Sequence, residues 1–147
     1  MKVLKFGGSS VGSVESLRNV KKIVESRDGS LVVVVSALGG VTDMLIKVSR
    51  MAAASDIQYK QLYQEIRQRH TELMDGVFQN PDPQLLQEVN SLLDRLGDML
   101  QGLYLLRTLT PQTLDQIVSF GERMSSRIVA HLISRPLRQC PYSQRGP

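Results

Sequence analysis

Residues suited to holding phosphate stand near the start of the chain, at positions 5–11 (KFGGSSV). Glycine lets backbone N–H groups approach an anion because it has no Cβ atom, and lysine supplies a full positive charge. The apolar residues Met1–Leu4 predict a strand before this segment, and Val14–Val24 predict a helix after it. A helix N-terminus adds unpaired N–H donors. This order predicts a phosphate site, although an ordinary strand-to-helix turn can have similar residues.

The common phosphate motifs do not fit this segment. Gly7 and Gly12 have the spacing of a P-loop, but Ser13 stands where that motif requires lysine. The dinucleotide pattern G-x-G-x-x-G is also absent from the segment. The lysine instead precedes the glycines, so it should lie at the carboxyl end of the strand.

Two further segments also combine glycine with hydroxyl-bearing residues. Residues 31–43 (LVVVVSALGGVTD) begin with five apolar residues that predict a strand buried on both faces, as in a parallel sheet. A loop of small residues follows, and then a helix that should start near Thr42. The third segment, residues 119–125 (SFGERMS), lies within the last predicted helix. The first two segments therefore predict two strand-to-helix loops.

In this order, the three segments resemble the N-terminal signature of aspartate kinases, in the amino-acid kinase family. The resemblance covers residues 1–134 and implies an α/β, parallel-sheet, amino-acid-kinase-like fold, of which only the N-terminal, amino-acid-substrate side is present. It implies transfer of the ATP γ-phosphoryl group to the side-chain carboxylate of L-aspartate. The product, 4-phospho-L-aspartate, begins lysine, threonine and methionine biosynthesis. ATP would enter as its Mg²⁺ complex, and we expect no tightly bound cofactor.

The resemblance also implies what this chain lacks. In the family, the second half of the kinase domain holds most of the nucleotide, regulatory domains usually follow, and some members are fused to homoserine dehydrogenase. We therefore expect this chain to be inactive alone and the full-length protein to be a homo-oligomer.

Lys5 is the candidate catalytic residue, because its ammonium group would neutralise the donor phosphate and the acceptor carboxylate, which repel each other. The backbone amides of Gly7, Gly8 and Ser9 would bind phosphate oxygens. The alternative, without the resemblance, is that Lys5 is a solvated lysine at a strand end.

Glu122 is the candidate ligand of the α-ammonium group of aspartate, a role that the family resemblance implies as well. Its helix also carries the apolar residues Phe120 and Met124, and a carboxylate in apolar surroundings needs a cationic partner. The alternative is a solvated glutamate that pairs with Arg123 or Arg127.

Ser36 and Thr42 flank the glycines of the second loop, and their hydroxyl groups could bind the carboxylates of the acceptor. The matched positions of the family contact the amino-acid substrate. A simpler role for Thr42 is to be the N-cap of a helix that begins at Asp43. The two roles are compatible.

The middle of the chain predicts a helical hairpin of residues 59–78 and 84–107, separated by the turn at 80–83. We expect the two helices to bury their apolar faces against each other, rather than to form a dimer zipper. Thr110 and Pro111 predict the start of the last helix. The second helix of the hairpin carries apolar residues at heptad spacing: Leu85, Val89, Leu92, Leu96, Met99, Leu103 and Leu106.

Composition limits the partners. Of 147 residues, 41% are hydrophobic and 22% are charged, which is ordinary for a globular protein. The net charge is +4, and three of the positive charges are arginines in residues 135–147. Residues 1–134 are therefore almost neutral and lack the basic stripe of a nucleic-acid-binding protein. No apolar run reaches the roughly 20 residues of a membrane span. Only one cysteine is present, so we expect a cytoplasmic protein without an internal disulfide.

The two histidines, His70 and His131, lack the spacing of metal ligands, so we expect no metal site. Residues 135–147 are rich in proline and show no periodicity, and we expect this tail not to belong to the family. A truncation, a shifted reading frame or vector sequence would explain it.

Two other functions stay open. One is a different kinase of the superfamily that acts on another carboxylate or on a carbamate. The other is a non-catalytic helical fragment that binds a partner subunit, which the heptad pattern would support.

Overall fold

The computed structural model describes residues 1–134 and begins with a small α/β unit. Strands β1 (Lys2–Phe6) and β2 (Leu31–Val35) form a parallel pair, in which Lys5 lies opposite Val34. Two helices, α1 (Gly8–Val11) and α2 (Val14–Glu25), connect the strands. The sequence predicted both strands and α2, which are confirmed, but α1 was expected to be loop.

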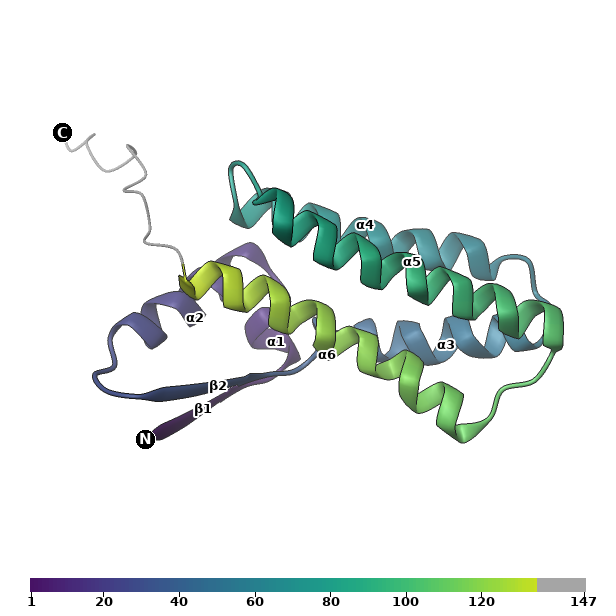
Figure 1. Cartoon of the computed structure of the whole chain (residues 1–147), viewed down its shortest axis with the longest axis horizontal. Coiled ribbons are helices and arrows are strands. Elements are labelled where there is room, and N and C mark those ends of the chain that lie inside the picture. Colours follow the sequence, from purple (N-terminus) through teal and green to yellow (C-terminus); the bar gives the residue numbers. More distant parts are fainter. Residues whose placement is uncertain (135–147) are drawn as a thin grey trace.

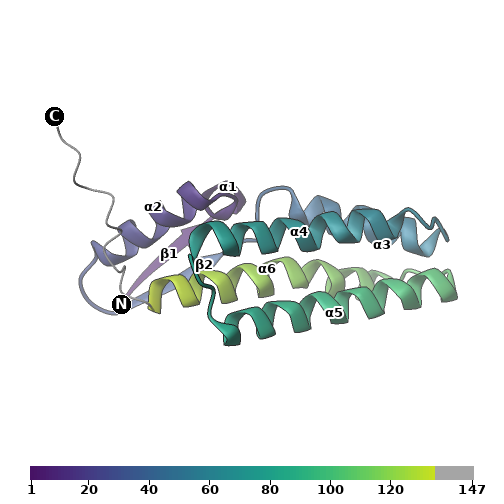
Figure 2. The same ribbon diagram turned by 90° about the horizontal axis from the view of Figure 1, so that it is seen from above.

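Four longer helices follow: α3 (Val41–Ala53), α4 (Tyr59–Val77), α5 (Pro83–Leu106) and α6 (Pro111–Ser134). They form an elongated bundle beside the α/β unit, and α6 runs from the far end of the bundle back to the strands (Figures 1 and 2). Contacts of α6 with β2 and α2, and of α4 with α2, join the two parts. No helix among residues 1–134 combines the length and the apolar character that a membrane crossing needs.

The starts of α5 and α6 show why these helices begin where the sequence predicted. The Asp82 carboxylate accepts a hydrogen bond of 2.8 Å from the amide of Gln84, next to a proline in the first turn. The Thr110 hydroxyl likewise accepts a bond of 3.1 Å from the amide of Thr113. Each cap satisfies an N–H group that the helix itself leaves without a partner.

The strand pair is covered on one face only. The alternate residues Leu4, Val33 and Val35 pack against the hydrophobic core. The two strands lie below α1, α2 and α6 in the view of Figure 1. On the other face, Val3 is 62% exposed and Val32 is 42% exposed. The prediction that the second strand is buried on both faces is therefore wrong for the described chain, because its helices lie on one side of the sheet.

The predicted hairpin is present, but α5 packs more closely against α3 and α6 than against α4. Contact between α4 and α5 is made by long side chains, as in the 2.7 Å hydrogen bond from the Tyr63 hydroxyl to the carbonyl of Leu93. The apolar stripe of α5 is also wider than a heptad seam, because Leu93 and Leu100 are fully buried. Leu106, which was expected in the seam, is 76% exposed. The mutual burial expected of the two helices is therefore corrected to burial in a four-helix core.

Candidate functional site

The two strand-to-helix loops touch each other. We call residues 7–13 loop 1 and residues 36–40 loop 2. The amide of Gly39 donates a hydrogen bond of 2.9 Å to the carbonyl of Gly8. A Cβ atom on Gly8 would lie 3.1 Å from the carbonyl oxygen of Ala37 and 3.2 Å from the Cα of Gly39. Glycine at position 8 therefore allows the backbones of the two loops to approach each other, in addition to the predicted approach to an anion.

The start of α3 differs from the prediction. Gly40 is the N-cap, in the left-handed conformation with φ of 80°, and the helix begins at Val41. Thr42 is thus in the first turn, and its interpretation as the N-cap residue is wrong. A glycine with positive φ ends loop 2 more readily than a β-branched residue does, which explains the earlier start of the helix. Asp43 lies in the first turn, where an acidic side chain suits the helix dipole.

The third segment brings α6 against loop 2. A Cβ atom on Gly121 would lie 2.7 Å from the Cβ of Ala37, so only glycine allows this approach without a shift. One turn later, the buried hydroxyl of Ser125 donates a hydrogen bond of 2.7 Å to the carbonyl of Ser36. Neither the role of Gly121 nor that of Ser125 was predicted from the sequence. The available signal was a pair of small residues four positions apart, on a helix face that is otherwise made of large apolar residues.

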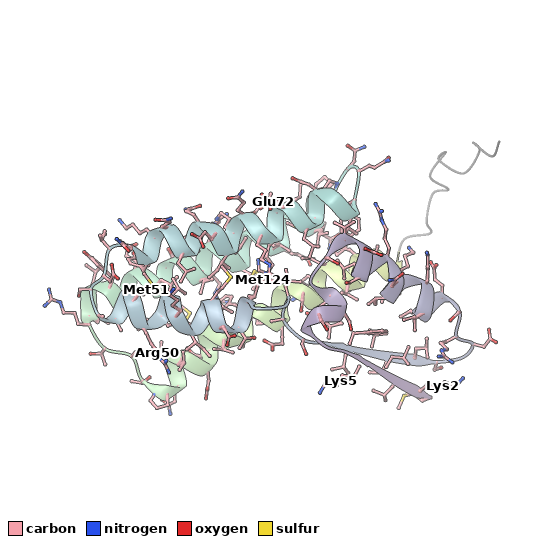
Figure 3. The ribbon with its side chains drawn as sticks, turned by 180° about the vertical axis from the view of Figure 1, so that it is seen from behind. Lys2, Lys5, Arg50, Met51, Glu72 and Met124 are labelled. Atoms are coloured by element: carbon pink, nitrogen blue, oxygen red, sulfur yellow. The ribbon has the colours of Figure 1, made fainter. Side chains whose placement is uncertain are left out.

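Lys5 lies on the open face of the sheet, on the same side as Val3 and beside Val34. Its side chain projects from the strand away from the helices (Figure 3). Within residues 1–134 it makes neither a hydrogen bond nor an ion pair. The ammonium group is therefore available to an anion that approaches this face.

Glu122 is exposed, so the apolar surroundings that the sequence suggested for it are absent from the described chain. The alternative pairing is not found either. Arg123 lies over the ring of Phe120, with 4.9 Å between the guanidinium carbon and the ring centroid. Arg127 forms its ion pair with Glu88 instead, at 3.8 Å. The Glu122 carboxylate consequently has no cationic partner among residues 1–134.

Several donors in the two loops and at the start of α3 have no hydrogen-bond partner among the described residues. The amides of Gly8 and Ser9 donate no hydrogen bond within the described part of the chain. The hydroxyl groups of Ser36 and Thr42 have no partner there either. Gly7, also a predicted phosphate ligand, is exposed and is the N-cap of α1. Such donors can bind an anionic ligand without first breaking a bond within the protein.

The contacts unite some of the predicted site residues and leave others apart. Gly8 is joined to loop 2 by the Gly39 amide, and Ser36 is joined to α6 one turn beyond Glu122. No described contact joins Lys5 to Glu122 or Thr42. In the part of the chain that the structure describes, no group of three or more histidine, cysteine, aspartate or glutamate residues could hold a metal ion.

Proteins of known sequence resemble this chain over most of its length. It is 33% identical to aspartokinase 1 (chloroplastic) of Arabidopsis thaliana over 135 residues, which cover 87% of this chain and 22% of the relative. It is 29% identical to the chloroplastic bifunctional aspartokinase/homoserine dehydrogenase 1 of Zea mays over 143 residues, which cover 95% of the chain and 15% of the relative. The chain thus spans less than a quarter of the length of these two relatives.

Solved structures show the same fold. Escherichia coli aspartokinase III, in complex with aspartate and ADP, matches with a TM-score of 0.80 and 24% identity, over 90% of this chain and 28% of that one. Clostridium acetobutylicum aspartate kinase matches with a TM-score of 0.71 and 21% identity, over 90% of this chain and 29% of that one. The chain therefore has the N-terminal part of an amino-acid-kinase-like fold, as the sequence predicted.

Sequence comparison with the family as a whole agrees. The match to the amino acid kinase family covers residues 1–143 and so runs past the boundary that the sequence analysis set after residue 134. The predicted tail itself, residues 135–147, lies outside the described residues. With loop 1 bonded to loop 2, loop 2 bonded to α6, and a family match over nearly its whole length, the chain belongs to the amino acid kinase family.

Proposed function

We propose that this chain is the amino-acid-substrate side of an aspartokinase catalytic domain. The whole enzyme would transfer the γ-phosphoryl group of ATP to the side-chain carboxylate of L-aspartate, in the pathway to lysine, threonine and methionine. The observation that carries this proposal is the convergence of loop 1, loop 2 and α6 through the Gly39–Gly8 and Ser125–Ser36 hydrogen bonds. The relatives named as aspartokinases support it.

The reaction needs charge neutralisation more than covalent help. A carboxylate oxygen of aspartate forms a bond to the γ-phosphorus, the bond from that phosphorus to the bridging oxygen breaks, and ADP leaves. Both reactants are anions, so the approach costs free energy that the Lys5 ammonium group would offset. The amides of Gly7, Gly8 and Ser9 would hold phosphate oxygens, and Mg²⁺ would enter with ATP.

The acceptor would be held by its two ends. The hydroxyl groups of Ser36 and Thr42, which have no partner within residues 1–134, would donate to its carboxylates. The exposed Glu122 would accept from its α-ammonium group. The contact with Glu122 would distinguish an amino acid from a simple dicarboxylate, because only the amino acid carries an ammonium group.

Calorimetry of this chain with L-aspartate tests the acceptor site directly. Succinate is the matched control, since it has both carboxylates and lacks the ammonium group. We expect L-aspartate to bind at least about tenfold more tightly than succinate, because one charge-assisted contact would be lost. Equal binding of the two, or no binding of L-aspartate, would contradict the proposal.

The alternatives predict different results. A kinase for another carboxylate or for a carbamate would bind its own acceptor. Only under this alternative should L-glutamate or carbamate displace L-aspartate from the chain. A non-catalytic interaction fragment would bind neither ligand, and sedimentation would show association that ATP and aspartate do not change. The heptad residues offer this second alternative little support, because most of them are buried within the chain.

The remaining expectations also belong to this proposal. We infer that the isolated chain lacks measurable kinase activity, that the complete enzyme is a homo-oligomer, and that it binds neither nucleic acid nor membrane. The cytoplasm remains the predicted location, although several relatives carry the word chloroplastic in their names.

A further inference from the structure

The hydrogen bond from Ser125 to Ser36 joins residues that are 89 positions apart in the sequence. Ser125 is fully buried, and its hydroxyl lies 2.7 Å from the Ser36 carbonyl and 3.2 Å from the carbonyl of Glu122. A serine hydroxyl has one proton to donate, and the shorter contact is the one to Ser36. The side chain therefore reaches out of its own helix and into loop 2.

The backbone of Ser36 is held from two directions. Its amide donates a hydrogen bond of 3.0 Å to the carbonyl of Phe6, which prolongs the pairing of the two strands by one residue. Its carbonyl accepts from Ser125 on α6. With both groups fixed, the peptide units on either side of Ser36 cannot rotate freely, so the direction of its side chain is set relative to β1 and α6 together.

The close seating of α6 supports this contact. Gly121 lies one helical turn before Ser125, on the same face, and has the methyl group of Ala37 against it. A side chain at position 121 would push the helix away from loop 2 and lengthen the hydrogen bond at position 125. The two small residues thus form one docking contact for the loop.

We propose that Ser125 is a positioning residue of the acceptor site. It acts through the backbone of loop 2: its hydroxyl fixes the conformation in which Ser36 and Thr42 present their side chains to the carboxylates of the substrate. Because Glu122 stands one turn earlier on the same helix, the same bond fixes the distance between the group for the ammonium end and the groups for the carboxylate end. This inference rests on the proposed function for its substrate and on the observed contacts for its geometry.

Ser126 provides a matched control. It is exposed on the same helix, and its hydroxyl donates only within that helix, to the carbonyl of Arg123 at 3.0 Å. The variants Ser125→Ala and Ser126→Ala therefore remove the same atom from adjacent positions, and only one of them releases loop 2.

Hydrogen exchange of this chain tests the geometry without any ligand. In Ser125→Ala we expect the amides of residues 36–42 to exchange about tenfold faster, because the Ser36 carbonyl loses its donor. The amides of α5 should be unchanged, and Ser126→Ala should match the unaltered chain. Unchanged exchange at residues 36–42, or an equal increase over the whole chain, would overturn the proposal.

Ligand affinity tests the link to function. By calorimetry, Ser125→Ala should bind L-aspartate about tenfold more weakly, and Ser125→Thr, which keeps a hydroxyl, should recover most of the affinity. An affinity that Ser125→Ala leaves unchanged would overturn the positioning role. If the unaltered chain binds no L-aspartate, the proposed function of this chain fails, whereas the exchange measurement still decides whether Ser125 positions loop 2.

Discussion

The ammonium group of Lys21, on α2, donates a hydrogen bond of 2.7 Å to the carbonyl oxygen of Leu132, near the end of α6. Lys21 is 1% exposed and also lies 3.5 Å from the carboxylate of Glu25. The last carbonyl groups of a helix lack partners within it and carry the negative end of its dipole, so a buried cation suits this place. The contact ties the end of α6 to the helix that precedes β2.

Replacement of this lysine should weaken the fold. In Lys21→Met the Leu132 carbonyl loses a charged donor, and we expect the free energy of unfolding to fall by about 1.5–3 kcal/mol. Urea denaturation followed by circular dichroism measures the change. Lys22→Met is the control, because Lys22 is exposed on the same helix and should change stability little. Equal effects of the two variants would show that the Leu132 contact contributes nothing.

Lys5→Ala should abolish most phosphoryl transfer in a complete aspartokinase that has residues 1–134 of this chain as its N-terminal segment. Loss of a donor of this kind costs on the order of 10²–10³ in rate. A coupled assay of ADP release measures it. Lys2→Ala alters another exposed lysine of the same strand and should leave the rate unchanged. Retention of a tenth of the activity in Lys5→Ala would refute its assignment.

Glu122→Gln should act on the acceptor and not on the nucleotide. The amide keeps the shape of the side chain but removes the charge that would attract the α-ammonium group, so the KM for aspartate should rise about tenfold or more. The KM for ATP should stay within about twofold. Asp115→Asn, on an exposed position of the same helix, should change neither value. An unaltered KM for aspartate in Glu122→Gln rejects the role.

Gly121→Ala should destabilise the chain, because the new Cβ would lie 2.7 Å from the Cβ of Ala37. Overpacking of this kind costs about 1–3 kcal/mol. Gly102→Ala is the matched control: it is also a glycine within a helix, but a Cβ there would meet no atom within 4 Å. The control should gain about 0.5–1 kcal/mol from its higher helix propensity. In thermal unfolding, Gly121→Ala should lower the melting temperature and Gly102→Ala should raise it. Changes in the same direction would contradict the steric argument.

His70 should make stability depend on pH. Its ring is fully buried, Nδ1 bonds to the Ile66 carbonyl at 2.7 Å, and Nε2 has no partner among the described residues. Burial lowers the pKa of His70, and the charge of Arg69 lowers it further, against the opposing effect of the Ile66 carbonyl. The unfolded chain therefore takes up a proton near pH 6.5, before the folded chain does.

The direction in which stability changes with pH follows from this order of protonation. The contribution of His70 is complete above about pH 6.5 and is lost as the pH falls from there through the lower pKa of the folded state. Urea midpoints measured from pH 8 to pH 5 should therefore decline on the acid side. His70→Leu should flatten the decline, because it removes the buried imidazole. A decline that is the same in His70→Leu would assign it to other groups.

The order and the approximate bounds of the long elements could be predicted from the sequence, because their signals are local. Apolar periodicity marked the helices, and a capping hydroxyl followed by proline marked the start of α6, as at Thr110 and Pro111. The Asp82 cap of α5 was not predicted, because residues 80–83 were interpreted only as a turn. Gly40 shows the limit of this reasoning. Its positive φ moved the start of α3 ahead of the threonine that was expected to cap it.

The packing of the helices could not be predicted, because it depends on partners that are distant in the sequence. Lys21 and Leu132 are 111 positions apart, and nothing next to either residue indicates their contact. A buried lysine also contradicts the usual preference of that residue for water. Likewise, the apolar residues of α5 showed that one face is buried, but not that α3 and α6 cover it.

The candidate site was predicted as a set of residues but not as a geometry. Ser36 was expected to act through its hydroxyl, and its carbonyl turned out to be the atom that joins loop 2 to α6. Gly8 was chosen for its approach to an anion, and its closest neighbours are Ala37 and Gly39. Each of these contacts involves backbone atoms, whose position no pattern of side chains discloses.

The uncovered face of the strand pair carries Val3, Val32 and Val34 together with Lys5. A second layer of protein over this face would remove water from the three valines and from the Lys5 ammonium group at the same time. In the drier surroundings, the attraction between that cation and a phosphate would grow several-fold. If the proposed function holds, covering this face would therefore make Lys5 a stronger phosphate ligand only where bulk water is also excluded.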